Sequence, residues 1–330
     1  MKPFKTIEEQ IEILHERGLD VKHPNIKEIL FKEGYYNIIN GYKDIFLEDE
    51  SSENFKENAR FIDIYNLYHL DRMLRNQALN ACMTCENIIK TSLSYEIANH
   101  YGVKESEYLK RSNYRSRKKN GIGKKNKYIL DDVLDNLNYI LKSKDEPYIH
   151  YRNDHNHIPP WILLKGANFW TIKTFFTLQK EDVKNAVTAN ILDKNVNFIK
   201  EEDKRFLSDI IHVIYKFRNR AAHSGRIYNY KIVNLEKEVD KDSVTYYKPF
   251  HDELRISENL YNDGYGRFDF YTFYYSTKRI LTKDYFKTYR FQTIMIVQKM
   301  ITLYKEDYTK ILSLMGVPEH LLSLPVNEIF

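Results

Sequence analysis

Apolar positions recur at helical spacing along most of the chain. At the N-terminus Ile7, Ile11 and Leu14 fall on one face of a helix. Residues 6–9 have the spacing of a capping box, and Gly18 is expected to end this first helix. Two further short helices are expected over 26–32 and 35–39, each followed by a glycine. Residues 61–100 contain no Gly or Pro and predict one long helix. Because its apolar positions cover more than one face, this helix is expected at the centre of a bundle.

The remaining pattern is also mainly helical. Helices are expected over 131–143, 159–178, 181–191, 201–224 and 284–312. Residues 236–270 are mixed, charged and rich in tyrosine, which predicts irregular structure or a hairpin. We therefore expect a mostly α fold: a helical bundle with an N-terminal helical extension and a C-terminal helical elaboration. The expected parts are an N-terminal region (1–58), a core (59–235) with a basic insertion (108–130), and a Tyr-rich segment with a final helix (236–330).

Composition narrows the class of protein. The 330 residues are enough to bury a core, and 11 Gly and 8 Pro are few for the many turns of a sandwich or propeller. Cys82 and Cys85 are the only cysteines, so a disulfide framework is not expected. Without a second pair, these two residues are only a weak indication of zinc or redox chemistry. No apolar stretch reaches 18 residues and the N-terminus does not resemble a signal peptide. We expect a cytoplasmic protein with no membrane segment, no cofactor and no metal site.

The net charge of +5 hides an uneven distribution. The windows 108–130 and 210–235 contain no acid and carry +9 and +5, which leaves −9 for the rest of the chain. Such acid-free basic segments favour contact with nucleic acid. Tyr108, Tyr114 and Tyr128, interleaved in the first window, offer rings for base stacking. The candidate RNA-binding residues are Arg115, Arg117, Lys118, Lys119, Lys124, Lys125, Arg220 and Arg226.

The second window contains a candidate catalytic motif, with Arg218 and Asn219 followed by His223 at a predicted helix end. Histidine takes up and releases protons near neutral pH, and arginine binds phosphate oxygens with a planar fork. Together they can cleave RNA without a metal, because the ribose 2′-hydroxyl attacks the adjacent phosphate while His223 moves a proton. An alternative is that these cations only complement the helix dipole.

Helix geometry favours a site shared between two chains. At 3.6 residues per turn Arg218 and His223 are about 140° apart, whereas Asn219 and His223 share a face. Arg218 must therefore reach around the helix or act in a site completed by a second copy, which predicts a homodimer. Glu86, four residues before Lys90, either forms an ion pair with it or orients a catalytic group on a neighbouring helix.

Several segments resemble the Abi-like family of bacterial abortive-infection proteins, which belong to the HEPN superfamily of ribonucleases. They are YYNIINGYKDIF (35–46), IYNLYHLDRMLR (64–75), ENIIKTSLSYEIANHYG (86–102), PPWILL (159–164), FRNRAAHSGRIYN (217–229) and MGVPE (315–319). The resemblance implies a HEPN-type helical core, homodimerisation and metal-independent RNA cleavage in phage defence. It makes Arg218 and His223 the two motif residues and Asn219 the polar residue after the arginine, and it gives Tyr228 a supporting role.

The resemblance also makes a small regulatory RNA an expected partner, since some members act as toxins held in check by such an RNA. Two other readings of the sequence remain open. The basic insertion suits a non-catalytic protein that binds a structured RNA, and the helical pattern alone suits an interaction protein without nucleic acid.

Overall fold

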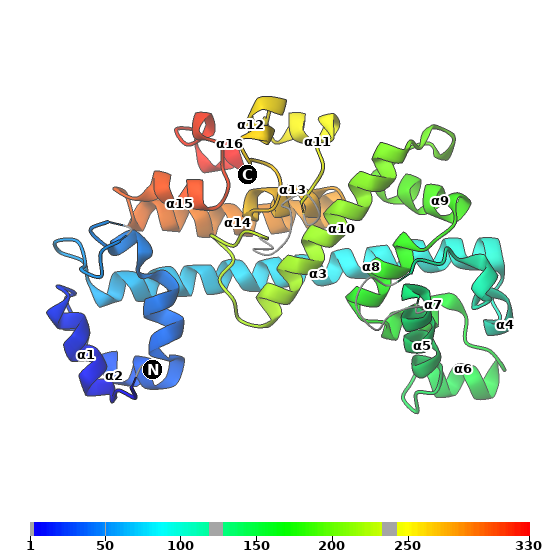
Figure 1. The fold of residues 1–330 in the computed structure, drawn as a ribbon, viewed down its shortest axis with the longest axis horizontal. Helices are drawn as coiled ribbons and strands as arrows, with labels where there is room; N and C mark the ends of the chain where they lie inside the picture. Colours follow the sequence, from blue (N-terminus) through cyan, green and yellow to red (C-terminus); the bar gives the residue numbers. More distant parts are fainter. Residues whose placement is uncertain (1–2, 50, 119–127, 233–242) are drawn as a thin grey trace. The chain divides into compact units, whose positions relative to one another are not determined.

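The computed structural model describes residues 3–49, 51–118, 128–232 and 243–330, which are mostly helical (Figure 1). In these ranges, the strand-like pairing consists of isolated bridges such as Asp20 with Arg60. The prediction of a mostly α fold is confirmed. The α-helices are α1 (Ile7–Glu16), α2 (Ile26–Glu33), α3 (Phe61–Tyr101), α4 (Glu105–Tyr108), α5 (Ile129–Leu141), α6 (Tyr148–Asp154), α7 (Pro160–Leu163), α8 (Phe169–Thr177), α9 (Glu181–Leu192), α10 (Glu201–Ala222), α11 (Lys248–Glu253), α12 (Glu258–Asn262), α13 (Phe270–Lys278), α14 (Lys283–Leu303), α15 (Tyr308–Leu314) and α16 (Val326–Ile329).

Short turns of other helical types join them. A π-helical turn covers Tyr36–Asn40, and 3-10 turns cover Lys43–Phe46, Arg111–Asn113, Leu164–Gly166, Val196–Phe198 and Glu319–Leu321. None of the helices in the described part of the chain has the length and apolar content needed to cross a bilayer.

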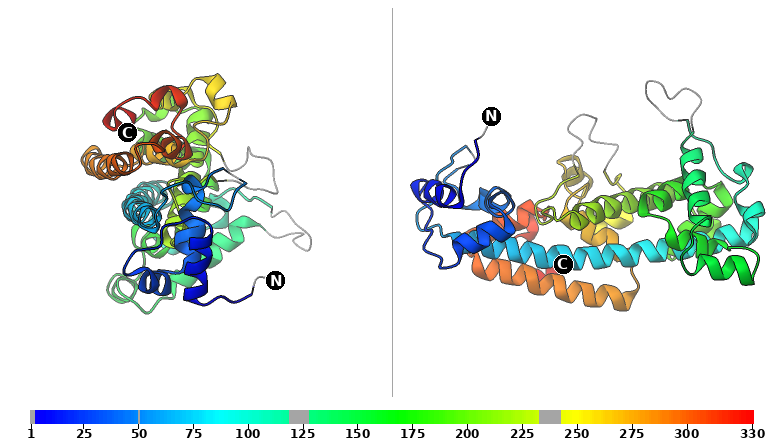
Figure 2. Two further views of the ribbon diagram at one scale, coloured as in Figure 1. Left: turned by 90° about the vertical axis from the view of Figure 1, so that its left-hand side faces the viewer. Right: turned by 90° about the horizontal axis from the view of Figure 1, so that it is seen from below.

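The chain folds into two compact units that interleave along the sequence. The first unit contains Met1–Gln77, Arg220–Tyr230 and Tyr289–Phe330, and the second contains Ala78–Asn219 and Lys231–Thr288. Both units draw on α3, α10 and α14, which Figure 2 shows from two further directions. The three parts expected from the sequence are consecutive, unlike these units, and that division stays a prediction.

The first unit begins with the helices that the pattern predicted. The Thr6 hydroxyl accepts a hydrogen bond from the Glu9 amide (3.2 Å), and the Glu9 carboxylate accepts one from the Thr6 amide (2.8 Å). This is the predicted capping box, and it satisfies two amides at the start of α1. Leu14 of α1, Ile38 of the π-helical turn and Ile64 of α3 are fully buried in this unit.

The second unit is built around the later part of α3 and most of α10. The Cys82 thiol on α3 lies 3.7 Å from the Ile214 carbonyl oxygen on α10, so these two helices are in contact within the unit. Phe217 of α10 stacks on Phe273 of α13 with ring centroids 4.4 Å apart. The apolar side chains of α10 thus face the core, as the predicted periodicity requires.

Two predicted helices are wrong in their continuity. The single helix expected over 159–178 is divided into α7, a 3-10 turn and α8, because Asn168 starts a new helix by accepting a hydrogen bond from the Thr171 amide (2.9 Å). The helix expected over 284–312 ends at Leu303 and restarts at Tyr308. Tyr304 turns inward there and donates a hydrogen bond to the Asp63 carbonyl oxygen (2.8 Å). No glycine or proline at this position indicates in the sequence that the helix ends.

The Tyr-rich segment agrees with its prediction in part. Its described part, 243–270, contains the short helices α11 and α12 joined by irregular segments, rather than a hairpin. Residues 236–242 lie outside the described residues. Helix α13 follows, with its side chains from Phe270 to Thr277 buried in the second unit. A helix that is buried on all sides lacks the one-sided apolar pattern by which partly exposed helices are recognised in sequence.

Candidate active site

The C-terminal end of α10 is closed by a backbone motif that presents His223. The Ser224 amide donates to the Ala221 carbonyl (3.1 Å) and the Gly225 amide donates to the Arg220 carbonyl (2.9 Å). Ser224 adopts a left-handed conformation with φ of 58°. This is the hydrogen-bond pattern of a Schellman motif, with serine at the position where glycine is most common. The helix therefore ends next to His223, and the His223 side chain is exposed.

Asp71 of α3 binds the backbone of the segment that follows His223. Its buried carboxylate accepts hydrogen bonds from the amides of Tyr228 (2.9 Å) and Ile227 (3.3 Å) and from the Tyr42 hydroxyl (2.6 Å). Burial raises the pKa of Asp71, and these hydrogen bonds act in the opposite direction. One turn along α3, Arg75 donates to the Ser224 carbonyl oxygen (3.1 Å) and is only 7% exposed. The loop after His223 is thus fixed by two residues of α3.

A cavity of about 520 Å³ lies in the first unit beside this loop. Its lining residues come from three stretches of sequence and include five basic residues and one acidic residue. They are Lys32, Glu33, Tyr36, Asn37, Asn40, Gly41 and Tyr42; Tyr68, Arg72 and Arg75; and Arg220, His223, Ser224, Gly225 and Arg226. We call this cavity the arginine pocket. Its excess of positive charge, with polar groups around an exposed imidazole, suits a phosphate-containing ligand.

The arginine pocket contains candidates that the motif alone predicted and others that it missed. The sequence pointed to Arg220, His223 and Arg226, which the structure places together in the lining. Glu33, Arg72 and Arg75 were missed, because helical periodicity does not reveal which distant helices meet. The sequence nevertheless contained an indication of these residues. The pocket residues of α3 and of the π-helical turn lie in two of the segments that resemble a known family, 64–75 and 35–46.

Two of the arginines are held in place by backbone groups. Arg226 hydrogen-bonds to the Gly41 carbonyl oxygen and lies 3.4 Å from an Asp44 carboxylate oxygen. Arg220 donates through Nε to the Arg226 carbonyl (3.0 Å). A Cβ atom at Gly225 would lie 2.3 Å from the Arg220 Nε, so glycine allows this arginine to lie close to the loop.

Arg218 and Asn219 belong to the second unit, because the boundary between the units falls between Asn219 and Arg220. Arg218 Nη1 lies 3.4 Å from the Asn219 side-chain oxygen. The buried Arg218 Nε has no hydrogen-bond partner among the described residues. Burial raises the pKa of the Cys82 thiol, and the nearby charge of Arg218 opposes this rise. The catalytic assignment of Arg218 and Asn219 stays a prediction.

The two residues expected to support the site, Tyr228 and Glu86, both make contacts that stabilise the fold. Tyr228 is fully buried and its ring stacks on Tyr42 with centroids 6.1 Å apart, so it lies behind the pocket lining. Glu86 forms an ion pair with Lys90 at 2.8 Å in the second unit, the first of the two roles considered for it. Their supporting roles in catalysis stay predictions.

The basic insertion is anchored at its ends. Arg115 forms an ion pair with Glu181, its amide donates to the Leu178 carbonyl (2.8 Å), and Lys118 pairs with Tyr128 through a bridge. Arg117 and Lys118 are exposed, whereas Lys119, Lys124 and Lys125 lie outside the described residues. Tyr108 and Tyr114 are buried, at 1% and 4% exposed, so their expected stacking on bases is wrong.

Within the described ranges, His, Cys, Asp and Glu side chains form no group of three that could hold a metal ion. Cys82 and Cys85 are free and buried, and burial raises the pKa of both thiols. A protonated buried thiol is a poor metal ligand and a poor nucleophile.

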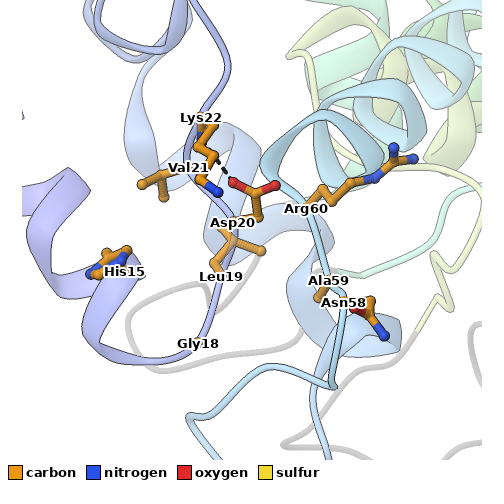
Figure 3. Close-up of a pocket in the computed structure, with 9 residues that line it drawn as sticks. All are labelled: His15, Gly18, Leu19, Asp20, Val21, Lys22, Asn58, Ala59 and Arg60. Atoms are coloured by element: carbon orange, nitrogen blue, oxygen red, sulfur yellow. Dashed lines mark hydrogen bonds between the residues drawn. The ribbon is translucent and has the colours of Figure 1, made fainter.

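The first unit contains a second cavity, of about 510 Å³ (Figure 3). Its Asp20 accepts a hydrogen bond from the Lys22 amide (3.0 Å), and Arg60, which also lines it, is engaged by Asp63 (2.7 Å). His15 lies on the α1 side of the hollow, away from Asp20 in this view. Because its charges are mixed and partly paired, this cavity is a weaker candidate than the arginine pocket.

The model of a family described as Abi-like protein matches residues 28–229. No curated protein and no solved structure matches the chain.

Proposed function

Since the chain belongs to the Abi-like protein family, we propose that it is a metal-independent endoribonuclease of bacterial abortive-infection defence against phage. The observation that carries this proposal is the arginine pocket, where an exposed histidine stands among four arginines. Arginine side chains bind the phosphate and stabilise the charge that develops on it. Histidine transfers protons near neutral pH.

The proposed reaction is an internal transesterification of RNA. The ribose 2′-oxygen attacks the adjacent phosphorus, the bond to the 5′-oxygen breaks, and the products are a 2′,3′-cyclic phosphate and a 5′-hydroxyl. His223 transfers one of the protons, and the arginines of the pocket stabilise the phosphorane-like transition state. DNA lacks the 2′-hydroxyl and is not a substrate.

We further propose that the active form is a homodimer. The family motif pairs Arg218 with His223, and the helix directs these two residues to different faces. A second copy of the chain can bring its own Arg218 to the phosphate held near His223. The enzyme is proposed to act in the cytoplasm, with a small non-coding RNA as a candidate inhibitor.

Cleavage of a single-stranded RNA in EDTA tests this function. Wild type is expected to produce 2′,3′-cyclic phosphate ends, and His223→Ala and Arg218→Ala are expected to lose activity by about 10²-fold or more. Two exposed residues away from the motif serve as controls, His320→Ala and Arg205→Ala, and both should remain active. Activity that survives in both motif variants would overturn the proposal.

A non-catalytic protein that binds structured RNA is the second candidate. The exposed Arg117 and Lys118 beside the insertion favour it. Salt-dependent RNA binding without cleavage, by wild type and His223→Ala alike, would support this function instead.

A further inference from the structure

Among the described residues that line the arginine pocket, Glu33 is the only one with a carboxylate. It is the last residue of α2, and its side chain is one-quarter exposed. Gly34 follows with φ of 85°, and the Asn37 side-chain amide donates to the Glu33 carbonyl oxygen (2.8 Å). The backbone that carries this carboxylate is therefore fixed where α2 turns into the π-helical segment.

Two residues of α3 orient the Glu33 side chain. The Tyr68 hydroxyl donates a short hydrogen bond to Oε2, and Arg72 lies 3.5 Å from Oε1. Burial and the Glu33 carboxylate raise the pKa of Tyr68 to about 12, so this hydroxyl keeps its proton and remains a donor. Lys32, which also lines the pocket, is paired with Glu28 one turn earlier on α2 (2.6 Å). The two side chains of α3 thus contact one carboxylate oxygen each and hold the Glu33 carboxylate in place.

The pocket then holds two different groups that transfer protons, a carboxylate on α2 and an imidazole after α10. Cleavage of RNA needs two such transfers, one from the 2′-hydroxyl and one to the departing 5′-oxygen. A single imidazole cannot carry out both at the same moment.

We propose that Glu33 is the general base of this pocket and that His223 is the general acid. The proposal rests on the function proposed above. Glu33 takes the proton of the 2′-hydroxyl as the bond from the 2′-oxygen to phosphorus forms. His223, protonated, gives its proton to the 5′-oxygen as the bond from phosphorus to that oxygen breaks. Electrons and protons balance without a metal or a co-reactant.

Replacement of the carboxylate with a smaller side chain tests this assignment. Glu33→Ala is expected to lower kcat by about 10²-fold on a single-stranded RNA that wild type cleaves, and added formate is expected to restore at least part of that loss. Formate supplies a carboxylate in the space left by the side chain. If the loss of activity came only from a structural defect, formate would not restore it. Glu33→Gln keeps the shape and fills that space, so it should be equally inactive and should not respond to formate.

Glu28→Ala is the matched control, because Glu28 lies on the same helix, forms an ion pair with the exposed Lys32 and does not itself line the pocket. It should keep wild-type activity and show no response to formate. Thermal unfolding of each variant shows whether it remains folded.

The outcomes separate the two proposals. If wild type cleaves RNA and His223→Ala does not, while Glu33→Gln keeps full activity, only the assignment of Glu33 is overturned. The same holds if Glu33→Ala loses activity and formate fails to restore it. If wild type does not cleave RNA under any condition, the proposed function fails and this assignment fails with it.

Discussion

At the scale of single residues, the surroundings of Asp269, a buried carboxylate outside the pocket, change its pKa. Asp269 is the N-cap of α13, and its carboxylate accepts hydrogen bonds from the Thr272 amide (2.8 Å) and hydroxyl (2.7 Å). Complete burial raises the pKa of Asp269 from 3.8 to about 6, despite these hydrogen bonds. Between these two values the folded protein holds a proton that the unfolded chain has released.

This difference predicts how stability depends on pH. A carboxyl with a raised pKa contributes stability that is fully present below pH 3.8 and is lost as the pH rises through 6. Asp269→Asn removes the titration and retains a good N-cap. The free energy of unfolding of wild type, relative to Asp269→Asn, should fall by about 3 kcal/mol between pH 3.5 and pH 7 in urea titrations. A constant difference across this range would contradict the prediction.

At the scale of elements, the end of α10 depends on α3. The loop after His223 has its amides bound to Asp71 and its Ser224 carbonyl bound to Arg75. Both residues lie within the first unit and are nearly buried. The pocket is therefore shaped by backbone groups that α3 satisfies.

Asp71→Ala should test this dependence. The substitution leaves the amides of Ile227 and Tyr228 and the Tyr42 hydroxyl without their acceptor, which should lower the free energy of unfolding by about 3–5 kcal/mol. Tyr42→Phe removes only one of these hydrogen bonds and should cost about 1 kcal/mol. Urea unfolding of the two variants measures the difference, and equal losses would show that Asp71 does not hold the loop.

The elements also show what the sequence could and could not predict. Helical periodicity with caps placed α1, α2 and α3 to within a few residues, since each has an apolar face or a clear end signal. It missed the break at Tyr304, which arises from a contact with Asp63 on a helix far away in sequence. For the same reason it found His223 and Arg226 but not Glu33, Arg72 or Arg75, because a pocket depends on which elements meet.

At the scale of the whole molecule, the proposed dimer makes a prediction about mixed subunits. If each site takes Arg218 from one chain and His223 from the other, a mixed dimer of Arg218→Ala and His223→Ala subunits contains one intact site. Equal mixing with full subunit exchange should then restore about one quarter of wild-type activity. RNA cleavage by the mixture, compared with each variant alone, measures this. A mixture that remains inactive, although the subunits exchange, would place both residues of a site in one chain.

The uneven charge of the chain makes a second prediction at this scale. Substituting serine for Lys119, Lys124, Lys125 and Lys127 removes four positive charges without altering the anchored Tyr114 and Arg115. If these lysines contact single-stranded RNA phosphates, the slope of log affinity against log salt should become shallower by up to about 3.

A matched set of exposed lysines on α14 and α15 is the control: Lys283, Lys287, Lys299 and Lys310. Filter binding over a range of salt concentrations gives both slopes. Equal slopes for the two sets would show that the insertion has no special contact with RNA.

The hydrogen bonds that close the arginine pocket join residues very far apart in the chain. Arg226 binds the carbonyl of Gly41 across 185 residues, and Tyr228 binds Asp71 across 157. Non-local contacts of this kind form late, since the intervening chain must first exist and fold. A nascent chain that has emerged from the ribosome only as far as Asn219 carries Glu33 and Arg72 but lacks Arg220, His223 and Arg226. The chain is made from its N-terminus, so the pocket stays incomplete until about two-thirds of the chain has been synthesised. A protein that is proposed to cleave RNA thus lacks its complete site during most of its own synthesis.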